Sequence, residues 1–263
     1  GFGQGVEVRR MLVAERQQQV LEMLQQRGSV DLETLAGQMN VSTSTARRDL
    51  EALEQQGLVE RTHGGAVYRG PQKHPVALSE RMNEQVEAKR RIGRYAACLV
   101  QPHTTVLFDG GSTVYFAAQQ VTTRPLQVVT NSLSIASLFA EDEQVELVVI
   151  GGNLYPRSGV LVGPIATRCL SDLHADLLFM SLAGLYEDGA YNQNLQMAEV
   201  ERTMLQQAAR RVMLMDSTKF GRKSLSRVCD INAVDQIVTD DRVSEHWARH
   251  CGDRLVVVGD ETT

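Results

Sequence analysis

The chain has 263 residues, of which 43% are apolar and 22% are charged, and this length suits two domains of unequal size. Its formal net charge of −5 argues against indiscriminate binding of nucleic acid, and no apolar run approaches the roughly 20 residues that cross a bilayer. The cysteines show no CxxC pair and no histidine at metal-ligand spacing, which predicts reduced thiols in a cytoplasmic protein: Cys98, Cys169, Cys229 and Cys251.

The first ten residues, GFGQGVEVRR, are interpreted as a remnant of cloning, so the first domain is expected over residues 11–70. Residues 16–27 predict a helix, because Val20, Leu21 and Leu24 recur at helical spacing and Gly28 follows where a left-handed C-cap is favoured.

Two further helices are predicted by cap residues and apolar periodicity. Ser29 and Asp31 are both candidate N-caps of a second, short helix, after which Asn40 can adopt the left-handed turn conformation. Ser42 is the candidate cap of a third helix, in which Ala46, Leu50 and Leu53 form the buried stripe.

Two short strands are predicted after these helices, at Leu58-Val59 and at Ala66-Val67-Tyr68, around a His63-Gly64-Gly65 turn. Three helices followed by a two-stranded wing make a winged helix-turn-helix. In that arrangement the N-terminus of the third helix faces the major groove of DNA.

Charge placement decides whether this domain binds DNA, because eight arginines face nine acidic residues before Gly70. With the apolar stripe inward, Arg47 and Arg48 face outward, where arginine can contact guanine or phosphate. Two structural alternatives remain open: Ser42 is only a cap, and the arginines pair with Glu51 or Glu54 at helical spacing.

The stretch TARRDLEALEQQGLVERTHGGAV resembles the N-terminal signature of the DeoR family of bacterial sugar-metabolism regulators. The resemblance implies a repressor of operator DNA, and because such repressors read paired half-sites, a homodimer or homotetramer is expected. The residues expected to contact double-stranded DNA are Ser42, Thr43, Ser44, Thr45, Arg47, Arg48, Arg61 and His63.

Residues 71–84 are expected to be a linker, since RGPQKHPVALS carries glycine and proline without an apolar period. A helix follows over residues 87–100, and its basic residues are either a solvated face or a contact for phosphate: Lys89, Arg90, Arg91 and Arg94.

Over residues 85–263, short apolar runs alternate with helical segments, which predicts a doubly wound α/β domain with a buried parallel sheet. The expected strands are Thr105–Phe108, 126–130, 145–150, 177–180, 212–215, 236–239 and 255–258.

Polar residues stand where five of these strands end, and such sheets bind ligands beyond the carboxyl ends of their strands. A small phosphorylated ligand suits glycines, hydroxyls and helix N-termini, with Asp109 and Asp216 accepting from sugar hydroxyls and Lys219 offsetting phosphate charge. Any single glycine pair is also explained by a tight turn. Neither GxGxxG nor GxxxxGK[ST] occurs, so dinucleotide and P-loop sites are poorly supported.

The blocks DGGSTV, TNSLSIA, VIGGNLYPRSGVLVGP and DSTKFGRKS resemble the DeoR effector domain, whose fold is similar to ribose-5-phosphate isomerase. The resemblance implies a phosphate cradle at residues 110–113. One departure occurs: where many relatives carry acidic residues and then a lysine, this chain has Gln196, Met197 and Glu201. The expected effector-binding residues are Asp109, Gly110, Gly111, Ser112, Thr113, Asn131, Ser132, Gly152, Asp216 and Lys219.

The resulting hypothesis is a repressor of a carbohydrate-utilisation operon, controlled by a phosphorylated sugar, sugar acid or sugar alcohol, without cofactor or catalytic residue. The alternative is a sugar-phosphate isomerase fused to a DNA-binding head, with a carboxylate of Asp109 or Asp216 as base and Lys219 as the cation. The helical pair His246 and His250 lacks a third ligand nearby, so no metal site is predicted.

Overall fold

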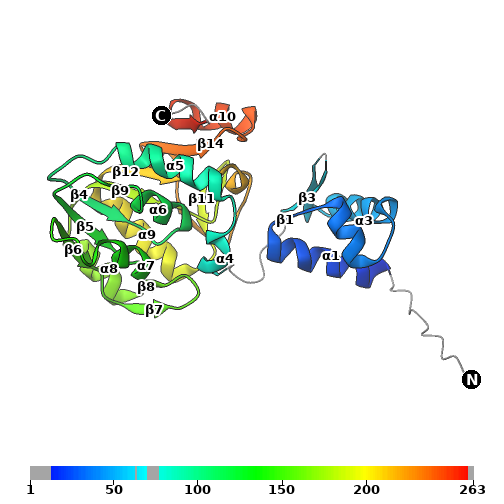
Figure 1. Ribbon diagram of the computed structural model, residues 1–263, viewed down its shortest axis with the longest axis horizontal. Coiled ribbons are helices and arrows are strands. Elements are labelled where there is room, and N and C mark those ends of the chain that lie inside the picture. The colour runs from blue at the N-terminus through cyan, green and yellow to red at the C-terminus, as the bar shows by residue number, and fades with distance from the viewer. Residues whose placement is uncertain (1–12, 63, 70–76, 260–263) are drawn as a thin grey trace, which may run out of the picture. The chain divides into compact units, whose positions relative to one another are not determined.

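The computed structural model describes residues 13–62, 64–69 and 77–259 and separates into two compact units, Gly1–His74 and Pro75–Thr263 (Figure 1). The smaller unit consists of α1 (Val13–Arg27), β1 (Ser29–Asp31), α2 (Leu32–Met39), α3 (Thr43–Gln55), β2 (Val59–Arg61) and β3 (Gly65–Tyr68). The three helices and the wing strands β2 and β3 confirm the predicted winged helix-turn-helix.

The caps of the smaller unit show how the sequence sets its helices. Asp31, rather than Ser29, caps α2 by accepting a hydrogen bond from the backbone N–H of Thr34 at 2.8 Å. Asn40 ends α2 with a φ of 51°, in the left-handed region. Ser29 instead begins β1, a strand absent from the sequence prediction, which pairs antiparallel with β3 to give the sheet order β1-β3-β2.

The core of the smaller unit is closed by residues of all six elements. The third helix contributes the predicted stripe of Ala46, Leu50 and Leu53, each at most 3% exposed. Every buried apolar residue of this core lies between residues 20 and 68: Val20, Leu24, Val30, Leu35, Ala36, Ala46, Leu50, Leu53, Val59, Ala66 and Tyr68.

The larger unit is built on a seven-stranded parallel sheet, and all seven predicted strands are present in it. The strand order is β15-β14-β12-β9-β4-β5-β6, so the order reverses between the neighbours β4 and β9. The strands are β4 (Thr105–Phe108), β5 (Leu126–Thr130), β6 (Val145–Val149), β9 (Ala175–Met180), β12 (Ala208–Leu214), β14 (Gln236–Asp240) and β15 (Leu255–Val258).

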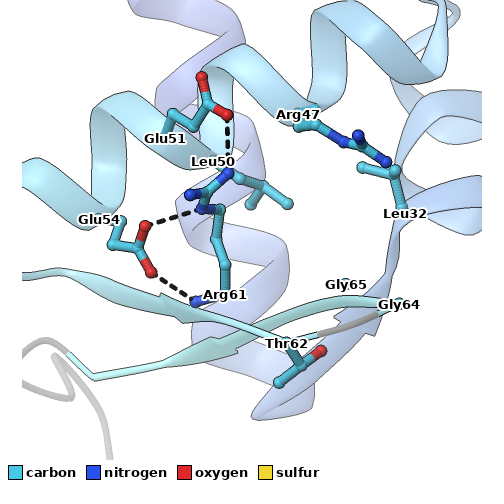
Figure 2. A pocket seen from close by; sticks show the side chains of 9 residues that line it. All are labelled: Leu32, Arg47, Leu50, Glu51, Glu54, Arg61, Thr62, Gly64 and Gly65. Carbon is cyan, nitrogen blue, oxygen red and sulfur yellow. Dashed lines mark hydrogen bonds and ion pairs between the residues drawn. The ribbon is translucent and has the colours of Figure 1, made fainter.

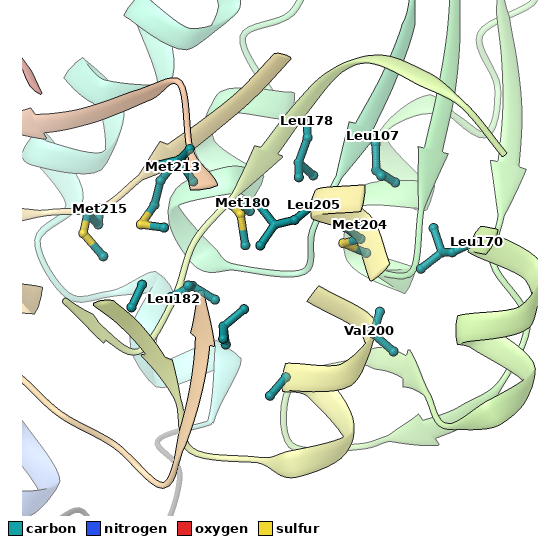
Figure 3. Packing of buried hydrophobic residues seen from close by; sticks show 14 of the residues in the cluster. Leu107, Leu170, Leu178, Met180, Leu182, Val200, Met204, Leu205, Met213 and Met215 are labelled. Atoms are coloured by element: carbon teal, nitrogen blue, oxygen red, sulfur yellow. The ribbon is translucent and has the colours of Figure 1, made fainter. Parts of the chain in front are cut away.

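Helices pack on both faces of this sheet, because alternate strand residues point to opposite sides. Phe108 and Phe179 face a cluster with α5 (Val86–Cys98), α6 (Ser112–Ala118) and α7 (Leu133–Phe139). The opposite face packs on α8 (Pro164–Ser171), α9 (Leu195–Gln207) and Cys251 of α10 (Glu245–Cys251). Figure 3 shows α9 residues packed against sheet residues such as Leu107, Leu178 and Met213. The doubly wound prediction is therefore confirmed.

Several short elements of the larger unit are absent from the prediction. Leu78–Met82 of the expected linker forms helix α4, which belongs to the larger unit. The others are the hairpin β7 (Asn153–Tyr155) and β8 (Val160–Val162), the antiparallel sheet of β10 (Gly184–Tyr186), β11 (Gly189–Asn192) and β13 (Ser226–Cys229), and the 3₁₀ helices η1 (Ser217–Lys219), η2 (Ile231–Ala233) and η3 (Gly252–Arg254).

Candidate DNA interface and effector site

The N-terminus of α3 is built by linked hydroxyl groups. The Ser42 hydroxyl accepts from the backbone N–H of Thr45 at 3.2 Å and lies 2.8 Å from the hydroxyl of Ser44. The Ser42 and Thr45 side chains are therefore engaged in the cap. Thr43 and Ser44 are exposed on the first turn, where unsatisfied N–H groups and a partial positive charge favour phosphate.

Arg47 and Arg48 are both exposed on α3, and neither forms a hydrogen bond or an ion pair with a described residue. The next residue, Asp49, is on the buried side of α3 and accepts from Arg16 of α1 at 2.5 and 3.0 Å. The buried acid thus balances Arg16 and leaves the charges of Arg47 and Arg48 uncompensated on the outer face.

The remaining acidic residues of α3 are paired with Arg61 of the wing. Its guanidinium donates to Glu51 and to Glu54, each at 2.7 Å, and its backbone N–H donates to Glu54 at 2.9 Å (Figure 2). The backbone N–H and then the guanidinium of Arg61 lower the pKa of Glu54. The structural alternative, in which Glu51 and Glu54 pair with Arg47 and Arg48, is wrong, because Arg61 takes both carboxylates.

A cavity of about 600 Å³ lies between α3 and the wing. Figure 2 shows Arg47 on α3, and Arg61 and Thr62 on the wing, with the Arg61 side chain reaching toward Glu51 and Glu54 of α3. Its lining is Leu32, Arg47, Leu50, Glu51, Glu54, Arg61, Thr62, Gly64 and Gly65.

The wing needs glycine at position 65, because a Cβ there would lie 2.1 Å from the carbonyl oxygen of Val30 in β1. This close approach lets β1 pair with β3 and fixes the wing against the start of α2. His63, expected to contact DNA, lies outside the described residues.

In the larger unit, Asp109 follows β4 at the point where the strand order reverses. Its backbone N–H donates to the carbonyl of Phe179 at the end of β9, and its carboxylate accepts from the backbone N–H of Ser181 at 3.2 Å. Burial raises the pKa of Asp109 to about 6, against the lowering effect of the backbone N–H donors and of Arg81. Ligands of doubly wound sheets bind in the crevice at such a switch point.

The glycines after Asp109 allow close packing beside it. A Cβ on Gly110 would lie 2.0 Å from the Cγ1 of Val160, and one on Gly111 would lie 2.7 Å from the Cβ of Ser181. Ser112 and Thr113 then begin α6 and are at most 5% exposed. The predicted cradle is therefore a tight, buried loop between β8 and the end of β9.

The end of β5 carries Asn131 and Ser132. The Asn131 amide nitrogen donates to the Leu161 carbonyl at 3.2 Å, whereas Ser132 caps α7 by accepting from the Ile135 N–H at 3.4 Å. Gly152, with a φ of 146°, packs close to β8. Ser132 and Gly152 thus have structural roles, and Asn131 keeps a free carbonyl oxygen among the described residues.

At the end of β12, Asp216 caps η1 by accepting from the Thr218 N–H at 3.0 Å. Lys219 ends η1, and burial lowers its pKa, with Asp216 acting in the opposite direction. The charges of Arg222 and Arg81 also act on Lys219. The charge of Asp109 in turn raises the pKa of Arg81. Arg81 therefore interacts electrostatically with Asp109 at the end of β4 and with Lys219 beyond the end of β12.

The sequence analysis missed Arg81 and left Lys89 undecided. Lys89 of α5 is only 2% exposed and donates to the carbonyl of Arg81 in α4, while burial lowers its pKa to about 8. Arg81 itself donates to the Ser158 hydroxyl at 3.3 Å. The neighbouring Arg90 is exposed and pairs with Glu87, as a solvated face would. The helical pattern alone could not separate the buried lysine from the exposed arginine.

Glu201 of α9 is buried beside this cluster. It is 1% exposed, and one of its oxygens accepts from the Asn192 amide at 2.5 Å. Burial, followed by the charge of Asp109, raises its pKa well above the ordinary value. The carboxyl edge thus carries cations on α4, α5 and η1 next to the carboxyl groups of Asp109 and Glu201.

Within the described ranges, no group of three or more His, Cys, Asp or Glu residues has the geometry of a metal site. His246 and His250 stack at 6.4 Å on α10, next to Trp247. In the same ranges, no helix has the length and hydropathy needed to cross a bilayer.

A winged helix with uncompensated arginines, followed by an α/β domain with a buried polar cluster, defines a DNA-binding regulator with a sensor domain. Residues 16–72 match the DeoR-like helix-turn-helix domain, and residues 84–241 match the DeoR C terminal sensor domain. The chain belongs to the DeoR family of transcriptional regulators.

Relatives of similar length carry regulator names. The chain is 31% identical to the HTH-type transcriptional repressor GlcR of Bacillus subtilis, over 88% of this chain and 89% of that protein. It is 32% identical to the L-fucose operon activator of Escherichia coli, over 87% and 96%, respectively. The protein is a regulator and not an enzyme, so the isomerase alternative is not retained.

Solved structures that resemble the chain do so distantly. Ribose 5 phosphate isomerase A from Neisseria gonorrhoeae is 15% identical with a TM-score of 0.38, over 54% of this chain and 56% of that chain. Translation initiation factor eIF-2B from Pyrococcus horikoshii is 12% identical with a TM-score of 0.45, over 87% and 82%. Neither resemblance is used here to infer the ligand of this protein.

Proposed function

We propose that the protein represses a carbohydrate-utilisation operon and that a small phosphorylated sugar or polyol controls its affinity for the operator. The observation that carries the proposal is the gathering of Arg81, Lys89 and Lys219 at the carboxyl edge of the sheet. Burial disfavours each of these charges, so an anion that neutralises them is bound with a gain in stability.

In this proposal, the DNA-reading surface consists of Thr43, Ser44, Arg47 and Arg48. These residues are exposed on the first two turns of α3, the part of a recognition helix that reaches base edges and phosphates. Arg61 acts indirectly, by holding the wing to α3 through its pairs with two glutamates. A homodimer or homotetramer presents two such helices to paired half-sites.

Helix α4 is proposed to couple ligand binding to the DNA-binding unit. It is the first described element of the larger unit after residues 70–76, and its Arg81 belongs to the polar cluster. The backbone N–H of Leu78 and the guanidinium of Arg81 hold α4 to Arg157 and Ser158. An anion that attracts Arg81 competes with this attachment and shifts α4 within the larger unit.

The proposed link to carbohydrates rests on the printed names of relatives. GlcR is named a repressor, whereas the regulator of the L-fucose operon is named an activator. Membership of the family therefore does not decide whether this protein represses or activates transcription. Repression is proposed here because it also agrees with the repressor CsqR of Escherichia coli, which is 30% identical over 86% of this chain and 87% of that protein.

The test begins with selection of genomic DNA fragments by the full chain, followed by footprinting of the selected site. A panel of phosphorylated sugars and polyols is then screened by thermal shift, since a ligand at 100 times its Kd stabilises the folded state by about 2.7 kcal/mol. The expected result is a protected site of paired half-sites whose occupancy changes with one member of the panel. Sequence-independent binding only, or a footprint insensitive to every phosphorylated compound, would overturn the proposal.

A further inference from the structure

β6 is the last strand at one end of the seven-stranded sheet, and its outer backbone edge pairs with no strand of the described residues (Figure 1). Natural proteins usually protect such an edge with lysine, proline or a bulge, because an open edge accepts another strand. The sequence of β6, VELVV, contains neither of these residues, and its register with β5 runs from Val145 to Val149 without a shift. The edge is therefore open to pairing with a further strand.

The side chains of β6 are more exposed than those of β15, the strand at the other end of the sheet. Three of the five residues of β6 are exposed, Glu146, Val148 and Val149, whereas only one of the four residues of β15 is exposed. Val148 and Val149 point to opposite faces of the sheet, because side chains alternate along a strand. They are 37% and 41% exposed, so both faces of the strand are open.

The apolar surface of β6 continues onto α8. Ile150 belongs to the same core cluster as Ala166 of α8, so Val148, two residues earlier, points to the sheet face that α8 covers. A Cβ on Gly151 would lie 3.6 Å from the Cγ2 of Ile165, which is itself exposed on α8. Apolar patches of this kind, bordered by polar residues, mark surfaces that bind another protein.

A second copy of the chain fits this edge, because β6 is self-complementary about a twofold axis. Antiparallel pairing centred on Leu147 uses all five residues, and it places Glu146 of one copy opposite Val148 of the other. Glu146 points to the face covered by α8, where Arg168 is exposed one turn after Ile165. Neither Glu146 nor Arg168 forms an ion pair with a described residue. The pairing thus brings the glutamate of each copy towards the arginine of the other.

We propose that β6 and the adjoining surface of α8 form a homodimer interface, in which the sheets of two copies join through antiparallel β6 strands. The strands supply backbone hydrogen bonds, Val148 and Val149 supply the apolar centre, and Glu146 and Arg168 supply the polar rim. The inference deepens the proposed function and rests on it for the choice of a second copy, because paired half-sites require an even number of chains.

Sedimentation equilibrium of the full chain tests the interface. The unaltered protein is expected at twice the 29.1 kDa of one chain, or at a higher even multiple. Val148→Lys should raise the dissociation constant at least tenfold and leave the thermal midpoint unchanged, because the position is exposed in the single chain and a lysine blocks strand pairing. Val257→Lys, the same change in β15, is the matched control and should leave the dissociation constant unchanged.

Exchange of charges between copies distinguishes an interface from a contact within one chain. Glu146→Arg places arginine opposite arginine, and Arg168→Glu places glutamate opposite glutamate, so each variant alone should dissociate at least tenfold more readily. An equimolar mixture of the two variants should recover association, because both ion pairs of the mixed dimer then join opposite charges.

A monomeric unaltered chain, an unchanged dissociation constant in Val148→Lys, or an equal loss in Val257→Lys would each overturn the interface. Variants at Glu146 and Arg168 that stay dissociated when mixed would overturn the proposed register. A footprint of paired half-sites would leave the proposed function standing in all of these cases. Failure of the unaltered protein to bind any operator would instead overturn the proposed function, while the dissociation constants would still decide the interface.

Discussion

Replacing Asp109 with asparagine is expected to stabilise the larger unit at neutral pH. The carboxyl group is 3% exposed, and burial raises its pKa from 3.8 to about 6. The folded state therefore binds the proton more tightly than the unfolded state, and stability is lost as the pH rises from about 4 to about 6. A difference of about two pKa units corresponds to about 3 kcal/mol of unfolding free energy at pH 7.5.

At pH 4.5, most of this cost has disappeared, because folded Asp109 is protonated there. From the same two pKa values, the remaining cost is about 1 kcal/mol, so the advantage of Asp109→Asn falls by about 2 kcal/mol between pH 7.5 and pH 4.5. The asparagine carbonyl can still accept the hydrogen bond from the Ser181 N–H, and its extra N–H group reduces the gain at pH 7.5 to about 1–3 kcal/mol.

Urea unfolding followed by tryptophan fluorescence measures this effect in the full chain. Trp247 lies on α10 and packs against Phe220 at a ring distance of 6.0 Å, so its signal reports the larger unit. Asp172→Asn, at an exposed position, is the control and should leave the pH dependence unchanged. A less stable Asp109→Asn variant at pH 7.5, with the pH dependence of the unaltered protein, would refute the reasoning.

Three further outcomes are expected. Arg47→Ala and Arg48→Ala should each weaken operator binding by about 1–3 kcal/mol in gel-shift titrations, and unchanged affinity in both would remove them from the interface. Asp49→Ala should destabilise the smaller unit by about 3 kcal/mol, measured by amide hydrogen exchange, since Arg16 loses its buried partner. The control, Glu60→Ala, removes an exposed partner of Arg69 and should cost under about 1 kcal/mol. Equal costs of the two substitutions would contradict the burial argument. Ser112→Leu should abolish the ligand response without changing ligand-free operator binding, and a normal response would place the phosphate elsewhere.

The inner strands of the large sheet were predictable from sequence because most of their residues are buried, whereas the edge strand β6, with Val148 and Val149 exposed, was predictable from its apolar run alone. Residues 105–108 and 126–130 are almost continuously apolar, and both ranges coincide with the observed β4 and β5. The three-residue strands β7, β8 and β10 were missed because three residues are too few to show a strand pattern, and each pairs with its hairpin partner over only three residues. Helix α4 was missed because it follows a proline- and glycine-bearing stretch that is typical of a linker.

The strand-end residues of the candidate site were predictable for the same reason: their positions follow from the sheet. Lys89 and Arg81 were not, because burial of the lysine depends on the α4 carbonyl that accepts its hydrogen bond, and no local pattern encodes that contact. Arg61 was likewise predicted to contact DNA because it is a basic residue of the wing. Its pairing with Glu51 and Glu54 depends on the fold of the wing, which brings together residues seven and ten positions apart.

The self-contained core of the smaller unit has a consequence for biosynthesis. Every residue of that core precedes residue 69. The polar cluster at the carboxyl edge of the large sheet, in contrast, is made of residues as far apart in the chain as Arg81 and Lys219. Domains fold as units during synthesis, and translation proceeds from the amino end at about 5–20 residues per second. The DNA-binding unit is therefore able to fold on the ribosome well before Lys219 has been synthesised. During that interval, the new chain can have a folded DNA-binding unit but cannot yet bind a ligand at the larger unit.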